Sequence, residues 1–116
     1  MKSPEKFKIG KNSRIKANTL QIADDVVIGD NVNIVCNKIT IGPQSIIKNN
    51  VKITCTEFHT GAGLYMCDNV EIGRGGCNGP SSKVLVGNNV GIFENTIINP
   101  SSQVKIGDNV GIGSEV

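Results

Sequence analysis

The chain has 116 residues, enough for one domain, and only 3% of them are aromatic, with no Trp. Its formal net charge is +2, with Lys and Arg scattered singly, which is too weak and dispersed for a nucleic-acid-binding surface. No apolar run approaches the ~18–20 residues of a membrane span, and residues 1–8 lack the apolar segment of a signal peptide. We therefore expect a turn-rich, cytoplasmic all-β protein without a membrane span or a nucleic-acid partner.

A seven-residue motif recurs along the chain in the order apolar, small, polar, Asn, apolar, any, apolar. Its copies begin at nearly constant intervals, at Ile9, Ile28, Ile47, Met66, Val86 and Ile106. The fourth position is Asn in every copy: Asn12, Asn31, Asn50, Asn69, Asn89 and Asn109. Self-similarity at a fixed period is typical of a solenoid.

Each period divides into three segments, each predicted to be a short strand followed by a turn. The first period divides into residues 9–14, 15–21 and 22–27, the second into 28–33, 34–40 and 41–46, and the third into 47–52, 53–59 and 60–65. The apolar residue that opens a segment and the one four later, such as Ile28 and Val32, are predicted to point inward. One coil cannot bury its apolar face alone, whereas stacked coils can. The repeated Asn suits a corner, because Asn tolerates left-handed backbone angles.

The hexads that open with Ile-Gly resemble the hexapeptide-repeat family. The resemblance implies a single-stranded left-handed parallel β-helix of about six coils over residues 9–116, each coil as long as one interval of the motif. It also implies an acyltransferase that moves acetyl from acetyl-CoA to a sugar hydroxyl or amine, working as a homotrimer with the site between subunits. An interval of this length exceeds three plain hexads, and we interpret the surplus as a bulge on one face. A right-handed solenoid is the alternative fold. Residues 1–8 are expected to cap one end, and the native chain to continue beyond Val116. The alternative is that the open last coil is an interface.

The chain contains one histidine, His59, at the end of the long middle segment of the third coil. Thr60 then takes the place of an apolar opener, and broken periodicity is where function often intrudes on a repeat. The resemblance implies that His59 is the general base, and Glu57 is a candidate to orient its ring. The alternative is an exposed turn histidine without a role. The predicted equivalents of His59 in the other coils are Gln21, Thr40, Gly79 and Asn99.

A glycine-rich segment, residues 73–80, follows one coil later. We expect Asn78 to lie near His59, where either Asn78 or backbone N–H groups stabilise the oxyanion. Arg74 is a candidate ligand for a phosphate of coenzyme A, with Gly75 and Gly76 allowing close approach to the backbone. The alternative is a turn that absorbs the one extra residue of this coil.

The four cysteines are predicted to be reduced in a cytoplasmic protein. Cys36 and Cys55 occupy equivalent places in consecutive coils and should stack at a separation that permits a disulfide, although a plain pair of thiols is preferred. Cys77 is expected to point inward together with Leu20, Ile39 and Phe58. A single histidine cannot build a zinc site of three histidines, so no metal is expected.

Two further patterns concern the surface. Phe93, Ile97 and Ile98 are expected to contribute to a subunit contact, and the alternative is that Phe93 is a surface aromatic without a role. The third motif position is mixed, which argues against a flat ice-binding or polysaccharide-binding face: Lys11, Asp30, Asn49, Asp68, Asn88 and Asp108. The remaining alternative to the enzyme is a non-catalytic scaffold that stacks or self-assembles.

Overall fold

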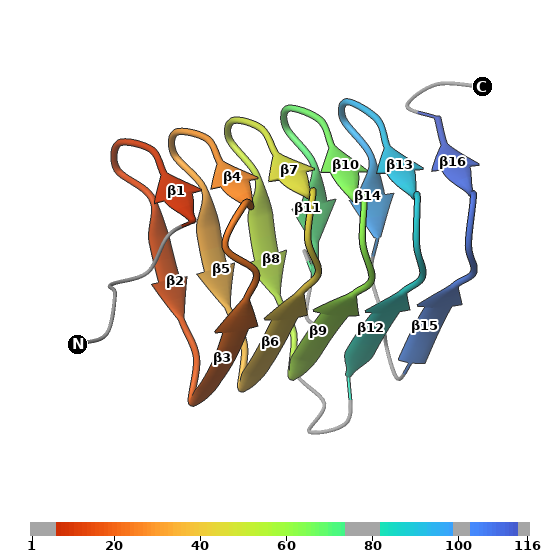
Figure 1. Ribbon diagram of the computed structural model, residues 1–116, viewed down its shortest axis with the longest axis horizontal. Helices are drawn as coiled ribbons and strands as arrows, with labels where there is room; N and C mark the ends of the chain where they lie inside the picture. The colour runs from red at the N-terminus through yellow and green to blue at the C-terminus, as the bar shows by residue number, and fades with distance from the viewer. Residues whose placement is uncertain (1–6, 74–81, 99–102, 114–116) are drawn as a thin grey trace.

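The computed structural model describes residues 7–73, 82–98 and 103–113, which form sixteen short strands in three parallel sheets (Figure 1). The first sheet contains β1 (Lys8–Ile9), β4 (Val27–Ile28), β7 (Ile46–Ile47), β10 (Tyr65–Met66), β13 (Gly91–Ile92) and β16 (Gly111–Ile112). The second contains β2 (Arg14–Lys16), β5 (Asn33–Val35), β8 (Lys52–Thr54), β11 (Glu71–Ile72) and β14 (Ile97–Ile98). The third contains β3 (Thr19–Ile22), β6 (Lys38–Ile41), β9 (Glu57–Thr60), β12 (Lys83–Val86) and β15 (Gln103–Ile106).

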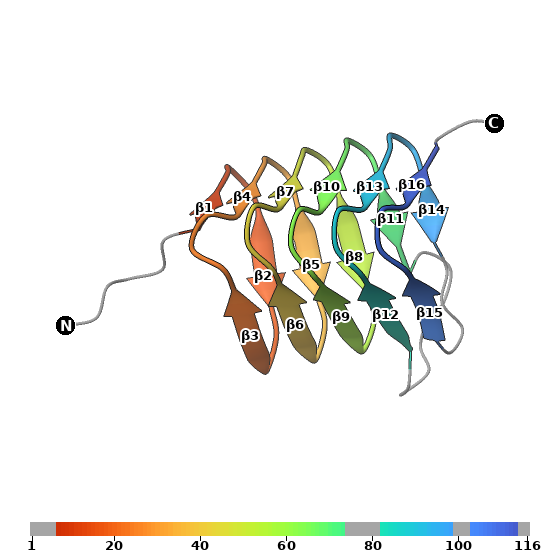
Figure 2. The same cartoon turned by 45° about the vertical axis from the view of Figure 1, so that its right-hand side comes forward.

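Each round of the chain adds one strand to each sheet, so the protein is an all-β parallel solenoid of about five turns. β1 and β16 lie at opposite ends of the first sheet, and the strands of the third sheet form one regular row (Figure 2). This confirms the predicted fold class. In the described part of the chain we find no helix long and apolar enough to cross a membrane.

The core fills the space between the three sheets with apolar side chains from the strands and from the turns beside them. Ile28 and Val32, the pair predicted to point inward, are 2% and 0% exposed. Phe58 is fully buried in the third sheet, where its register partners are Ile39 and Val84. Val84 therefore occupies the place predicted for Cys77, a residue outside the described part.

The register of the later coils differs from the prediction. Ile9, Ile28, Ile47 and Met66 succeed one another in the first sheet, as the motif predicts. Met66, however, pairs with Ile92 and not with the next motif opener, Val86. Val86 pairs instead with Thr60 at the end of the third sheet. The predicted count of about six equal coils is therefore wrong: one coil is longer than the motif interval, and the chain makes about five turns.

The recurrent asparagines do take left-handed backbone angles, but at two different corners. All six have φ between 57° and 62°. The first four mark the corner between the first and second sheets, where Asn95 (φ 64°) continues the row: Asn12, Asn31, Asn50 and Asn69. Asn89 and Asn109 mark the corner between the third and first sheets, in line with Gln44 and Gly63.

Asp and Asn side chains tie successive coils together at both corners. At the first corner each amide N–H donates to the side-chain Oδ1 one coil later: Lys11 to Asp30 (2.9 Å), Asp30 to Asn49 (2.9 Å) and Asn49 to Asp68 (3.0 Å). At the other corner the same contact joins Ala62 to Asn88 and Asn88 to Asp108, both at 2.8 Å. The mixed row predicted from the third motif position is therefore two rows. Each satisfies backbone amides that strand pairing does not reach.

Candidate functional site

His59 and Glu57 lie on the outer face of β9. Burial alternates along this strand: Phe58 and Thr60 face the core and are 0% and 5% exposed, whereas Glu57 and His59 are half-buried and face outward. Thr60 fits an apolar position because its hydroxyl donates to the Gly61 carbonyl at 3.1 Å. The period of two therefore places the carboxylate and the imidazole side by side.

The two side chains are in direct contact, with His59 Nε2 3.0 Å from Glu57 Oε1. Lys83 Nζ lies 3.9 Å from the other oxygen, Glu57 Oε2. The hydrogen bond from His59, followed by the charges of Lys83 and Lys38, holds the pKa of the Glu57 carboxyl below its usual range despite the cost of burial. An ionised Glu57 favours a proton on Nε2, which leaves the lone pair of the neutral ring on Nδ1.

A shallow, open groove of about 380 Å³ begins at His59 and crosses the ends of the third sheet. The residues that line it come from three successive coils: His59, Thr60, Gly61, Leu85, Val86, Gly87, Lys105 and Ile106. Leu85 is the register neighbour of His59, and Lys105 follows Leu85. The predicted neighbours Gly79 and Asn99 are therefore wrong for the fourth and fifth coils, whereas Thr40 is confirmed for the second.

Sequence reasoning missed Leu85 and Lys105 because it assigned the glycine-rich segment to the strand position beside His59. The signal was weak: Lys83–Val86 repeats the burial alternation of Glu57–Thr60, but its third residue, Leu85, is apolar and breaks the polar pattern. The groove that results combines an imidazole, an apolar floor and a terminal ammonium group.

The backbone amides of the two glycines in the groove are already used. Gly61 donates to the Val86 carbonyl at 3.0 Å, and Gly87 donates to the Ile106 carbonyl at 2.8 Å. These two N–H groups are therefore engaged in stacking the coils, and the predicted oxyanion donors must be sought elsewhere.

Four of the predicted site residues lie outside the described residues: Arg74, Gly75, Gly76 and Asn78. The two predicted site residues that the structure does describe, His59 and Glu57, lie together. Within residues 7–73, 82–98 and 103–113, no three His, Cys, Asp or Glu side chains gather as metal ligands.

An apolar column runs along the outer face of the first sheet. Val27, Ile46 and Tyr65 succeed one another in register and are 41%, 39% and 40% exposed. Phe93 continues the column, because its ring lies against Gly91 and Gly111, the next positions in that register. We call Val27, Ile46, Tyr65 and Phe93 the apolar column.

The residues predicted for a subunit contact divide between surface and core. Phe93 and Ile97 are 40% and 46% exposed, as expected. Ile98 instead pairs with the buried Ile72 and packs against the core, so its predicted role in a contact is wrong.

Comparison of the chain with protein-family models, with curated proteins and with solved structures found no match. The resemblance to the hexapeptide-repeat family therefore depends on the sequence motif.

Proposed function

We propose that the chain is an acyltransferase of the hexapeptide-repeat type, with a left-handed β-helix, that moves acetyl from acetyl-CoA to a sugar hydroxyl or amine. His59 is the general base and Glu57 orients it. The observation that carries the proposal is the 3.0 Å contact between His59 Nε2 and Glu57 Oε1 at the mouth of the groove. A carboxylate that fixes the tautomer of an imidazole is the arrangement that activates a hydroxyl for acyl transfer.

In the proposed mechanism the acceptor attacks the thioester directly, with His59 as the base. Nδ1 of His59 takes the proton of the acceptor, which then attacks the thioester carbonyl; the carbon–sulfur bond breaks, and coenzyme A leaves as a thiol after protonation. Lys105, at the far end of the same groove, supplies a positive charge for a phosphate of the donor. Arg74, Gly75 and Gly76 remain the predicted donor-binding residues and Asn78 the predicted oxyanion donor.

The first test is a thermal-shift titration with acetyl-CoA and desulfo-CoA. A ligand that binds only the folded state raises Tm by mass action, by an amount that grows with ligand concentration. We expect a saturable rise with both compounds in the wild type and in His59→Ala, because the base acts on the acceptor. A trimeric, folded protein that shows no shift contradicts the proposal.

The second test measures transfer to a panel of amino sugars and neutral sugars. We expect His59→Ala to reduce transfer by at least ~10²-fold, the scale of general-base catalysis, without loss of thermal stability. Glu57→Gln should reduce kcat while leaving the KM for acetyl-CoA nearly unchanged. Transfer that survives in His59→Ala shows that another group is the base.

A non-catalytic scaffold is the second candidate, favoured by the regular parallel stacking of the coils in all three sheets. Sedimentation velocity separates the two. A single closed species, the predicted homotrimer, favours the enzyme, whereas a length-dependent series of polymers favours the scaffold.

A further inference from the structure

Two thiols from successive coils face each other at the corner between the second and third sheets. Cys36 and Cys55 each follow a strand of the second sheet, directly after the paired residues Val35 and Thr54. Their Sγ atoms are 3.8 Å apart, and each residue is 7% exposed. This corner lies outside the groove, and the proposed transfer reaction does not use either sulfur.

The backbone around the pair is compatible with a covalent bond between the sulfurs. In-register residues on neighbouring parallel strands lie about 4.8 Å apart, within the range of about 4.4–6.8 Å between Cα atoms that disulfides span. Closing the Sγ atoms to the bonded distance therefore requires side-chain rotation and no slip of the strands. A backbone amide hydrogen bond at each position, from Cys36 to Lys16 (3.0 Å) and from Cys55 to Val35 (3.3 Å), holds the register.

The Cys36 sulfur also differs in its chemistry from Cys67, the third described cysteine. The contact with the Cys55 sulfur lowers the pKa of the Cys36 thiol, even though burial opposes the shift. Burial, together with the nearby Glu94, raises the pKa of the Cys67 thiol. Because the thiolate is the nucleophile, Cys36 is the more reactive of these two buried groups.

We propose that Cys36 and Cys55 form a dithiol modification site that a small hydroperoxide converts to a disulfide. In the first step the Cys36 thiolate attacks one oxygen of hydrogen peroxide; the O–O bond breaks and leaves a sulfenic acid and a hydroxide ion. In the second step the Cys55 sulfur attacks the Cys36 sulfur, forms the S–S bond and expels the second hydroxide. Protons released by the two thiols turn the hydroxides into water, so two electrons reduce one peroxide to two waters.

Formation of this disulfide also affects the candidate site. The Cys55 thiol lies 3.4 Å from the backbone carbonyl of Glu57, to which it donates. A disulfide has no S–H, so oxidation removes this hydrogen bond at the first residue of β9. The Glu57 side chain contacts His59, and oxidation therefore alters the surroundings of the imidazole. This step depends on the contacts and not on the proposed acyl transfer.

Mass spectrometry of the folded, full-length chain tests the bond itself. The Cys67→Ser/Cys77→Ser variant is treated with hydrogen peroxide, capped with an alkylating agent and digested with trypsin. Cys67→Ser is needed because no Lys or Arg separates Cys55 from Cys67, and Cys77→Ser leaves Cys36 and Cys55 as the two cysteines of the chain. We expect one cross-linked peptide pair containing Cys36 and Cys55, lighter than the sum of its parts by two hydrogen atoms. Thiols that remain alkylatable, or that pass to sulfinic acid without a cross-link, overturn the proposal.

Two matched variants distinguish a native pair from a general tendency to oxidise. In the wild type Cys36 and Cys55 should be consumed at least ~10-fold faster than Cys67, because of the thiol neighbour that each provides for the other. Cys36→Ser should abolish the fast phase, whereas Cys67→Ser should leave it unchanged. Equal rates for all three thiols, or a fast phase that requires denaturant, contradict the proposal.

NMR can detect the effect of the disulfide on the candidate site, because the chain has a single histidine whose ring resonances are easily assigned. The ring resonances of His59 should move on oxidation and return on reduction with dithiothreitol in the Cys67→Ser/Cys77→Ser variant. They should not respond to peroxide when Cys36→Ser is added. A disulfide that forms without moving these resonances overturns the coupling.

Discussion

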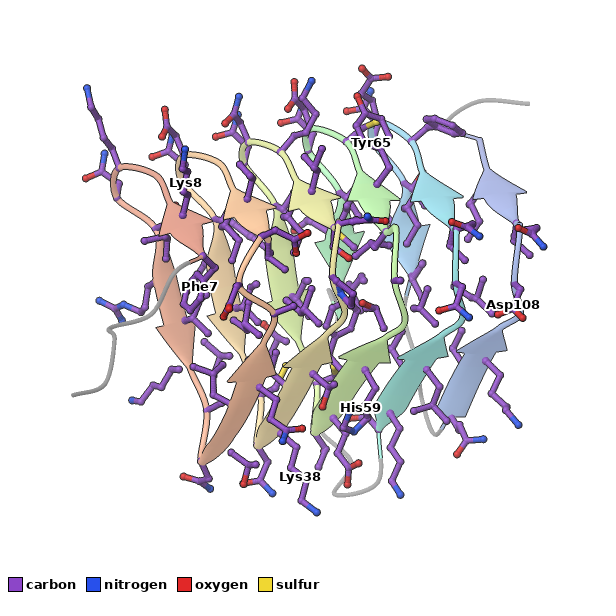
Figure 3. All side chains as sticks on the ribbon, in the orientation of Figure 1. Phe7, Lys8, Lys38, His59, Tyr65 and Asp108 are labelled. Atoms are coloured by element: carbon purple, nitrogen blue, oxygen red, sulfur yellow. The ribbon has the colours of Figure 1, made fainter. Side chains whose placement is uncertain are left out.

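Lys83 Nζ lies 3.9 Å from Glu57 Oε2, while the other oxygen of the same carboxylate contacts His59. The strand register places a lysine on each side of this carboxylate: Lys83 pairs with Glu57 from the following coil, and Lys38 pairs with it from the preceding one. Figure 3 shows Lys38 and His59 on the same outer face. Glu57 is therefore an anion held between cationic neighbours.

Glu57→Gln should make the stability of the protein less dependent on acid pH. The folded-state pKa of Glu57 is lowered, so the unfolded state binds more protons, and this carboxylate stabilises the fold above its unfolded pKa of about 4.3. That contribution is lost as pH falls through the lower folded pKa. Urea denaturation should show the largest difference between wild type and Glu57→Gln at neutral pH and almost none well below pH 4.

The exposed carboxylate Glu94 supplies a control for that measurement. Glu94→Gln changes the net charge equally but removes none of the contacts to His59 or Lys83. If the difference in stability between wild type and Glu57→Gln stays constant from neutral to acid pH, the contacts of Glu57 do not favour the ionised form of its carboxyl.

Asn31→Ala should destabilise the protein by about 1–2 kcal/mol, because a Cβ-bearing residue without a polar side chain is disfavoured at φ 59°. Asn31→Gly should cost much less, since glycine adopts these angles freely. Asn33→Ala is the control, on the exposed face of the neighbouring strand β5. Equal losses for the Ala and Gly variants in chemical denaturation would show that the left-handed angle is not the cause.

The sequence predicts the corners well and the register of the later coils poorly, for one physical reason. Every hexad has the same inside–outside alternation, so a slip by a whole hexad leaves the burial pattern unchanged. The copy of the motif that begins at Val86 therefore fits next to Thr60 in the third sheet as readily as next to Met66 in the first sheet. Asn89 tolerates either corner equally, because both require positive φ.

The candidate site was predictable to the extent that it depends on local alternation. Glu57 and His59 are two residues apart on one strand, so period two alone places them together. The placement of Leu85 and Lys105 beside His59 depends on the long coil between β9 and β12. The spacing of the motif does not reveal which residues of this coil pair with β9. The partners of His59 along its own strand were thus accessible from sequence, whereas those across coils were not.

Gly61→Ala should destabilise the chain by about 1–3 kcal/mol through a clash with the next coil. An added Cβ would lie 2.1 Å from Asn88 Oδ1 and 3.2 Å from the Gly87 carbonyl carbon. Asn88 has little freedom to withdraw, because its Oδ1 accepts the Ala62 amide at 2.8 Å. Moving it leaves that amide without its acceptor.

Gly107 occupies the equivalent corner one coil beyond Gly87, with no heavy atom within 4 Å of an added Cβ. Gly107→Ala should therefore leave the denaturation midpoint nearly unchanged. If both alanine variants lose the same stability, the cause is a general requirement of this corner and not the contact with Asn88.

Ile46→Lys should dissociate the proposed trimer. Ile46 lies in the middle of the apolar column, between Val27 and Tyr65, and an exposed run of this kind marks a protein contact. Burying a lysine ammonium in that contact without a partner costs several kcal/mol, more than an ordinary interface tolerates. Light scattering coupled to size exclusion should give the mass of one chain, with an unchanged far-UV spectrum.

Val35→Lys separates this effect from that of adding charge to any exposed β-branched position. Val35 is 36% exposed on the second sheet, away from the apolar column, so its variant should keep the mass of the wild type. A loss of mass in Val35→Lys alone would move the contact to the second sheet, where Ile97 is also exposed. A wild type with the mass of one chain would remove the homotrimer from the proposed function, and the transfer assay would then have to be interpreted for a site built within one solenoid.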